Sequence, residues 1–296
     1  MVRVVNIVQS WDIGSLPLRV EEKTIREGAS STDSILGKLG FPIQQSRIFE
    51  EEVVTAFIDK LNSGLDYPNY PQFRDMNHMF LEMISGVERI EGKYHVHDVL
   101  GLGKNRVIPE MLVLKQNISN IRDKTGKSKI NVKMCVTGPY TLSSLFINRS
   151  PELFNQLGSC LSKVVSNSIF RTRTGEVKLL SVDEPLLGMI DDTLLDRGSL
   201  GREALLKAMR NVYHSAKSRN LETCIHLHDT SNDLFWDIQD LDIIETHVED
   251  PLYELESTVK LLEEKDKKLR GSVALTPFDK LIETMLKKII QGTSRR

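Results

Sequence analysis

The sequence has 296 residues, enough to bury a large core and an ordinary length for one α/β barrel. A net charge of −2, with 27% charged residues, argues against a general binder of nucleic acids or anionic membranes. Three cysteines are too few for a disulfide framework, and no apolar segment approaches the ~20 residues that span a bilayer. The N-terminus also lacks the apolar length of a signal peptide, so we expect a soluble, cytoplasmic protein.

Short apolar segments that predict β-strands alternate along the chain with longer segments that predict helices. The clearest predicted strands are residues 3–8, 129–136, 177–182, 223–228, 241–246 and 271–275. The predicted helices are residues 50–63, 152–170, 202–218, 252–266 and 276–290. Several strands are almost continuously apolar, as expected of parallel strands covered on both faces. We therefore predict an α/β fold in which residues 1–296 form one domain, a single (β/α)8 TIM barrel.

A His-x-His pair ends the apolar segment Thr223-Cys-Ile-His-Leu-His and supplies the first candidate metal ligands. Residues i and i+2 of a strand project from the same face, so His226 and His228 would point the same way. Glu245 ends the next short apolar segment. Two imidazoles and a carboxylate from neighbouring strand ends suit a zinc ion with an open coordination position. The alternative is a hydrogen-bonded core histidine beside a solvent-facing one.

Three further motifs follow predicted strands, and a βα barrel has its active site at the carboxyl ends of its strands. Asp183 and Glu184 could hold an amine, position a substrate or transfer protons, or could form a solvated loop. Gly138-Pro-Tyr is followed by Thr141 as a predicted helix N-cap, and the free helix N-terminus could bind an anion or simply turn the chain. Gly14-Ser15-Leu-Pro, by itself, is an ordinary turn.

A second His-x-His pair, His95 and His97, has the same spacing as the first. No carboxylate follows it in a nearby second apolar segment. We therefore expect His95 and His97 to be structural or solvent-facing.

In this order and spacing, the motifs resemble the catalytic domain of cobalamin-independent methionine synthases, within the barrel superfamily that includes uroporphyrinogen decarboxylase and the coenzyme M methyltransferases. The resemblance runs over roughly residues 10 to 250. It rests on Ile13-Gly-Ser-Leu-Pro, Val136-Thr-Gly-Pro-Tyr-Thr-Leu, Val182-Asp-Glu-Pro, Ile225-His-Leu-His and Ile244-Glu-Thr. The short chain matches the single-barrel form of the family.

The resemblance implies a zinc site and a substrate site. The histidine of the family's His-x-Cys motif falls on His226, its cysteine on His228, and its glutamate ligand on Glu245. The family binds the amino-acid part of homocysteine through residues that fall on Ser15 and on Asp183. The implied reaction, in methionine biosynthesis, is transfer of a methyl group to a thiol that Zn²⁺ holds as a thiolate. The methyl donor would be a methylated folate, or methylcobalamin carried by a corrinoid partner protein.

Two departures from the family pattern affect these expectations. The family supplies a last zinc-binding cysteine near its C-terminus, whereas no cysteine follows Cys224 here. Tyr70 stands roughly where the family has a glutamate that holds the homocysteine amine, and a phenol cannot make the same charged contact at neutral pH. His247 and Glu249 could substitute as ligands if their strand continued, although Pro251 indicates that it soon ends.

Three functions are therefore open: a zinc-dependent methyltransferase acting on homocysteine or a related thiol, a related barrel enzyme with another substrate, and a non-catalytic paralogue or partner subunit. The methyltransferase is the first expectation. The protein could also form a homo-oligomer.

Overall fold

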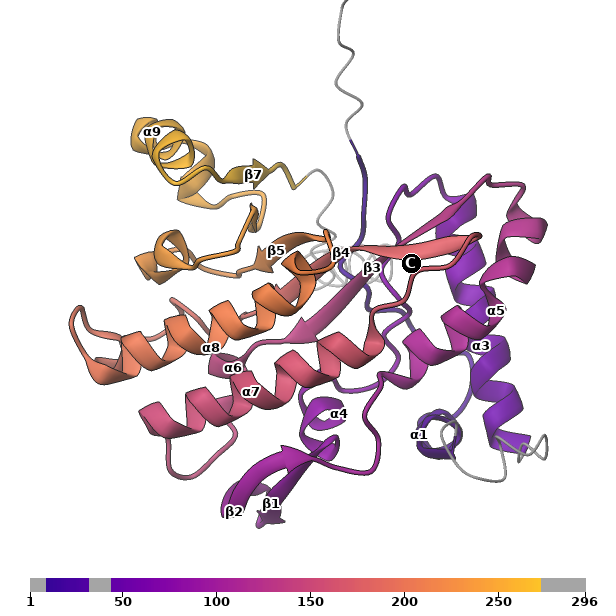
Figure 1. The fold of residues 1–296 in the computed structure, drawn as a ribbon, viewed down its shortest axis with the longest axis horizontal. Coiled ribbons are helices and arrows are strands. Elements are labelled where there is room, and N and C mark those ends of the chain that lie inside the picture. Colours follow the sequence, from indigo (N-terminus) through magenta and orange to yellow (C-terminus); the bar gives the residue numbers. More distant parts are fainter. Residues whose placement is uncertain (1–8, 32–43, 273–296) are drawn as a thin grey trace, which may run out of the picture.

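The computed structural model describes residues 9–31 and 44–272. Its centre is a five-stranded sheet in which all neighbouring strands are parallel, in the order β3-β4-β5-β6-β7 (Figure 1). The strands are β3 (Ile130–Thr137), β4 (Gly175–Asp183), β5 (Glu222–His226), β6 (Ile243–Glu245) and β7 (Lys268–Arg270). The fold is thus α/β with a parallel sheet, and each of these strands is adjacent to the next one along the chain.

Two segments without regular strand structure extend this parallel array beyond β3. Asn69 forms a parallel bridge with Lys133 of β3, and Ser15 forms a parallel bridge with Gln72. The N-terminal segment, the segment around Asn69 and the five strands thus follow one another in chain order, as in a βα barrel. Closure of the predicted barrel is not seen within the described residues. The predicted strand 3–8 and helix 276–290 lie outside them.

Helices cover this array. They are α1 (Glu22–Ser31), α3 (Gln44–Asn62), α4 (Met76–Glu82), α5 (Pro109–Thr125), α6 (Pro139–Ser143), α7 (Pro151–Ser168), α8 (Leu200–Lys217) and α9 (Glu256–Glu264), with short 3-10 helices at Thr193–Leu195, Asp233–Asp237 and Pro251–Tyr253. Figure 1 shows α7 and α8 side by side along the sheet. They approach closely at Gly158, where a Cβ would lie 2.6 Å from the Cβ of Ala208. Within the described ranges, no helix combines the length and apolar character needed to cross a membrane.

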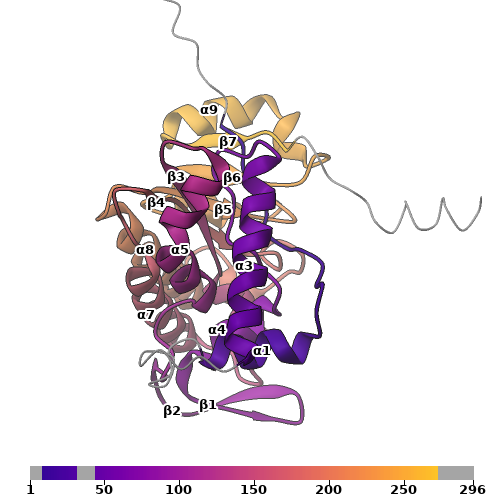
Figure 2. The same ribbon diagram turned by 90° about the vertical axis from the view of Figure 1, so that its right-hand side faces the viewer.

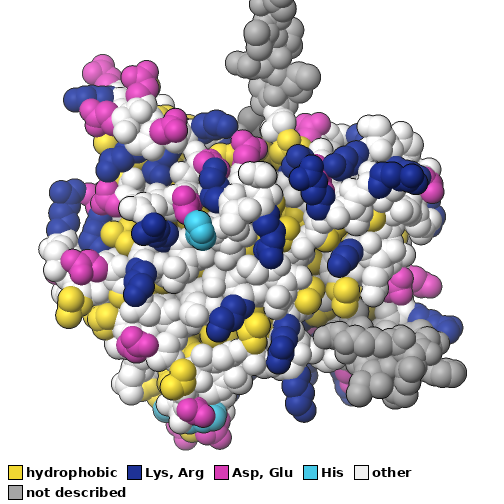
Figure 3. Space-filling view, in the orientation of Figure 1, with side chains coloured by type: hydrophobic (Ala, Val, Ile, Leu, Met, Phe, Trp, Pro, Cys, Tyr) yellow, Lys and Arg dark blue, Asp and Glu magenta, His cyan; other side chains and the backbone are white. Residues whose placement is uncertain are grey.

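An antiparallel hairpin, β1 (Ile84–Ile90) and β2 (Lys93–Leu102), follows the segment around Asn69. Figure 2 shows it at the end of the molecule opposite α9 and β7. The sequence did not predict this hairpin, nor α5. Of the predicted strand 271–275, residues 271 and 272 follow β7, which ends at Arg270, and residues 273–275 lie outside the described residues. Lys and Arg side chains are spread over the face shown in Figure 3, separated by uncharged surface.

The strand register brings five polar residues into one row at the carboxyl ends of the sheet. Thr137 is paired with Asp183, Asp183 with His226, His226 with Glu245, and Glu245 with Arg270. Residues paired across parallel strands project from the same face. One residue from each strand therefore lies on the same face of the sheet.

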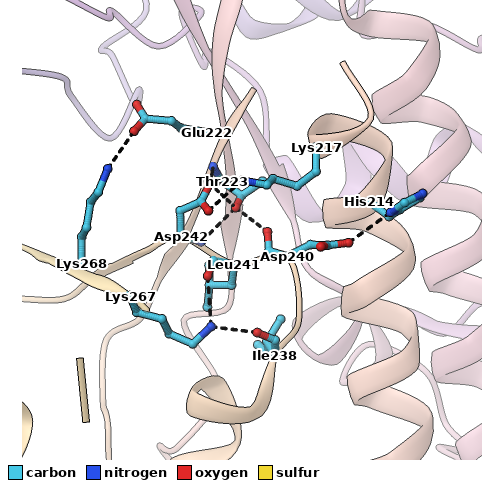
Figure 4. A network of polar contacts seen from close by, with 10 residues as sticks. All are labelled: His214, Lys217, Glu222, Thr223, Ile238, Asp240, Leu241, Asp242, Lys267 and Lys268. Atoms are coloured by element: carbon cyan, nitrogen blue, oxygen red, sulfur yellow. Dashed lines mark hydrogen bonds and ion pairs between the residues drawn. The ribbon is translucent and has the colours of Figure 1, made fainter. Parts of the chain in front are cut away.

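A polar network fixes the opposite, amino ends of β5, β6 and β7 (Figure 4). The Asp242 carboxylate accepts hydrogen bonds from the backbone N–H of Thr223 at 3.0 Å and from Nζ of Lys217 at 2.8 Å. Thr223 donates its hydroxyl to the Asp240 carbonyl, and Lys267 donates to the carbonyls of Ile238 and Leu241. The network holds β5 and β6 in the register that places His226 beside Glu245.

We expect Asp242→Ala to lower the free energy of unfolding by about 2 kcal/mol, because the buried N–H of Thr223 loses its hydrogen bond and Lys217 loses its ion pair. Urea denaturation followed by circular dichroism measures this change. The matched control is Asp240→Asn. Among the described residues, the Asp240 side chain pairs only with the exposed His214, and asparagine tolerates the positive φ of 61° at this position. Equal effects of the two substitutions would contradict the role of Asp242.

Candidate metal centre

The end of β5 is fixed on both sides by backbone hydrogen bonds. The carbonyl of His226 accepts from the N–H of Glu184 at 2.9 Å, and the N–H of Leu227 donates to the carbonyl of Glu245 at 2.9 Å. His226 and Leu227 are buried, and His228 is exposed. β5 ends at His226, two residues earlier than predicted, so His228 lies just beyond the strand at the same carboxyl edge of the sheet.

Three histidines form a cluster at this edge. His226, His228 and His247 each offer a ring nitrogen, and the three nitrogens lie within 4.8 Å of one another. The ring centroids of His228 and His247 are 4.5 Å apart, and that of His226 lies 5.3 and 5.7 Å from them. His247 is half-buried and follows β6 by two residues. Three imidazoles at this separation could bind a metal ion.

The protonation of the cluster fits a metal ion. Burial lowers the pKa of His226 to about 4, and burial together with the nearby His247 lowers the pKa of His228. The imidazole of His226 is therefore neutral at physiological pH, which is the form that binds metals. Its Nδ1 is buried and has no hydrogen-bond partner within the described part of the chain.

Glu245, the carboxylate predicted as a ligand, lies beside His226 but is bonded elsewhere. Its carboxylate accepts from Nε1 of Trp11 at 3.1 Å and from Arg270 at 2.5 Å, and Lys133 lies 3.8 Å away. Although burial raises it, the charges of Lys133 and Arg270 hold the pKa of Glu245 below its ordinary value. The histidine cluster contains His247 as its third member and not Glu245.

Asp183, the predicted substrate anchor and catalytic carboxylate, lies in register with His226 on the neighbouring strand. Its Oδ1 is buried without a partner among the residues that the structure describes. Burial raises the pKa of Asp183 to about 6. Asp183 is thus a carboxylate with a free acceptor at the same strand ends as the histidines.

Glu184, predicted as a second substrate-binding carboxylate, turns away and caps α6. It accepts from the backbone N–H groups of Tyr140 at 2.9 Å and Thr141 at 2.7 Å, and burial raises its pKa to about 7. Thr141 as N-cap is therefore wrong, because Gly138 is the N-cap and Thr141 lies inside the helix. A Cβ on Gly138 would lie 2.1 Å from Glu184 Oε1. The helix N-terminus expected to be free is thus occupied by the chain's own carboxylate.

The other two predicted substrate residues occupy different environments. Ser15 is exposed and follows Gly14, whose φ of +125° favours glycine. Tyr70 is fully buried and donates its hydroxyl to the Cys135 carbonyl at 2.8 Å. The Tyr70 hydroxyl is therefore used inside the protein.

His95 and His97 lie on β2, half-buried and exposed respectively, and do not belong to the histidine cluster. The sequence pattern singled out His226 and His228, and it gave His247 only as a possible substitute. It missed Lys133 and Arg270 as partners of Glu245. The signal for Lys133 was a lysine between the apolar residues Val132 and Met134, in the middle of a predicted buried strand.

Comparisons with known proteins agree with the resemblance seen in the sequence. The chain is 25% identical over 186 residues to a methionine synthase of Sulfolobus acidocaldarius, covering 60% of this chain and 50% of that protein. It is 26% identical over 171 residues to the methionine synthase of Saccharolobus solfataricus, covering 55% and 49%. No family model matches. The chain spans about half the length of the curated relatives it matches, and it is a distant homologue of these archaeal methionine synthases.

Among solved structures, a B12-independent methionine synthase from Shewanella sp. W3-18-1, in complex with selenomethionine, aligns with 80% of this chain and 72% of its own. The sequence identity is 14% and the TM-score is 0.47.

We expect the stability of the metal-free protein to depend on pH through His226. Its folded pKa of about 4 lies below its unfolded value of 6.5, so its contribution is present above pH 6.5 and is lost as the pH falls towards 4. The loss amounts to about 3 kcal/mol. Urea denaturation in EDTA, compared with His226→Gln at each pH, isolates this group. A difference between the two proteins that does not change with pH would contradict the neutral, buried state of His226.

Proposed function

We propose that this protein is a zinc-dependent methyltransferase that transfers a methyl group to the thiol of homocysteine or a related compound. The observation that carries the proposal is the cluster of His226, His228 and His247, which lies at the strand ends beside Asp183. The distant homology to proteins named methionine synthase supports the reaction class. Because the matches cover about half of those proteins, activity and substrate both belong to the proposal.

The three histidines would hold the metal, with His247 in the place for which the sequence predicted Glu245. Three imidazoles leave a zinc ion a fourth position for a substrate thiol, whose pKa it would lower when bound. The residues present fit this use, because His226 is neutral and has an unpaired Nδ1. Glu245 would instead neutralise Lys133 and Arg270 below the site.

Asp183 would accept a hydrogen bond from the amino group of the substrate. Its pKa of about 6 leaves it mainly ionised at neutral pH, and its unpaired Oδ1 is available. Ser15 would contact the amino-acid part from the adjacent N-terminal segment. Glu184 would act indirectly, since it anchors α6 next to Asp183. Methyl transfer to a thiol needs an in-line approach, so the main contribution of these residues would be orientation.

The methyl donor of the proposed reaction is a methylated folate or methylcobalamin carried by a partner protein. Both deliver a methyl group to the same thiol, so the proposal for the acceptor site does not depend on the choice. Product formation with each donor separates them.

A second function, a non-catalytic paralogue or partner subunit, is favoured by one observation. The two residues at positions where the family binds metal and amine, Glu245 and Tyr70, are both bonded within the protein. A decayed site would have this appearance. The two functions differ in whether the histidine cluster holds a metal.

Purified wild-type protein is expected to hold about one zinc ion per chain. His247→Ala should weaken zinc binding by roughly 100-fold or more, because changes even outside the first ligand shell cost roughly 10- to 100-fold. Glu245→Gln should weaken it far less. Competition with a chromophoric chelator measures the affinities, and His97→Ala, at an exposed histidine of β2, is the matched control.

Methionine formed from homocysteine and either donor then tests the reaction. A wild-type protein that binds no zinc and forms no methionine would support the non-catalytic function. Loss of zinc in Glu245→Gln but not in His247→Ala would show that Glu245, and not His247, is the third metal ligand.

A further inference from the structure

Buried polar atoms without hydrogen-bond partners gather around one region of the parallel array. The described residues contain nine such atoms. Five of them lie on three parallel segments at or near the candidate site: Asn69 Oδ1, Gln72 Nε2, Ser181 Oγ, Asp183 Oδ1 and His226 Nδ1. Because buried polar groups in folded proteins are nearly always paired, such a group of unpaired atoms indicates a place for a polar ligand.

Among these five atoms, Nε2 of Gln72 is the one amide nitrogen, and an amide nitrogen only donates hydrogen bonds. Its backbone N–H donates to the Gly14 carbonyl at 3.0 Å, and its carbonyl accepts from Leu16 at 3.3 Å, so it is fixed against the Gly14-Ser15 turn. Its side chain lies over Gly14, where a Cβ would be 2.8 Å from the Gln72 amide oxygen. Glycine at position 14 thus makes room for the amide.

The thiol of Cys135 lies near both Gln72, from the segment after Asn69, and Asp183, from the end of β4. Tyr70, two residues before Gln72, donates its hydroxyl to the Cys135 carbonyl, and the Gln72 amide lies near that hydroxyl too. Gln72 and Asp183 therefore bring a donor and an acceptor from two segments to the same buried residue.

We propose that Gln72 is a specificity-determining residue whose amide N–H donates to the carboxylate of the thiol substrate, while Asp183 accepts from its ammonium group. This inference rests on the proposed function. An α-amino acid has a carboxylate that can accept from the Gln72 amide and an ammonium group that can donate to the Asp183 carboxylate. The site would then discriminate against thiols that lack either group.

Three thiols separate the two contacts: homocysteine, 3-mercaptopropylamine, which lacks the carboxylate, and 4-mercaptobutyrate, which lacks the amine. Their binding to the zinc-loaded protein is measured by isothermal titration calorimetry without a methyl donor. Gln72→Met keeps the side-chain volume and removes the donor. We expect it to weaken homocysteine and 4-mercaptobutyrate by about tenfold or more and to leave 3-mercaptopropylamine unchanged.

Asp183→Asn should give the reverse pattern, weakening homocysteine and 3-mercaptopropylamine but not 4-mercaptobutyrate. Gln72→Glu, a second variant, should weaken 4-mercaptobutyrate further by charge repulsion and strengthen 3-mercaptopropylamine. Gln239→Met, at an exposed glutamine, is the control. A merely structural Gln72 would instead change the binding of all three thiols equally.

Two results would overturn the assignment, and they are distinguishable. Unchanged or uniformly reduced binding of the three thiols in the Gln72 variants, with homocysteine bound by the wild type, overturns the role of Gln72 alone. A zinc-loaded wild type that binds none of the thiols overturns the proposed function, and the role of Gln72 with it.

Discussion

The rest of the site depends on the interactions of the buried carboxylate of Glu245. It lies on β6 and joins three other parts of the chain, through Trp11 of the N-terminal segment, Lys133 of β3 and Arg270 of β7. Arg270 also donates to the Trp11 carbonyl and lies over its ring at 3.8 Å. A buried charge is tolerated only when it is paired, so these contacts fix one another.

Because of this pairing, adjacent positions at the carboxyl ends of the strands differ in charge and in hydrogen bonding. Glu245 and Arg270 neutralise each other, whereas His226 stays neutral and keeps an unpaired nitrogen. Because Glu245 is bonded to cations, the candidate metal ligands at this edge are imidazoles, and His247 supplies the third imidazole. The same row continues to Asp183, so the candidate metal site and the carboxylate proposed to bind substrate lie on neighbouring strands.

Sequence reasoning succeeded where the pattern is local. The strands ending at Thr137 and Asp183 were predicted to within one or two residues because each has a core of apolar residues, and the His-x-His pattern singled out His226 and His228, although β5 ends at His226. It missed the β1–β2 hairpin, whose strands are largely exposed. The bonding of Glu245 was not predictable, because Trp11 lies 234 residues away along the chain and Arg270 lies 25 away.

X-ray absorption at the zinc edge of the loaded protein tests the central claim most directly, because it reads the ligands themselves. We expect about three imidazole nitrogens at about 2.0 Å and no sulfur, with one Zn–S distance of about 2.3 Å appearing when homocysteine is added. Sulfur ligands in the thiol-free protein, or a coordination shell that homocysteine leaves unchanged, would contradict it.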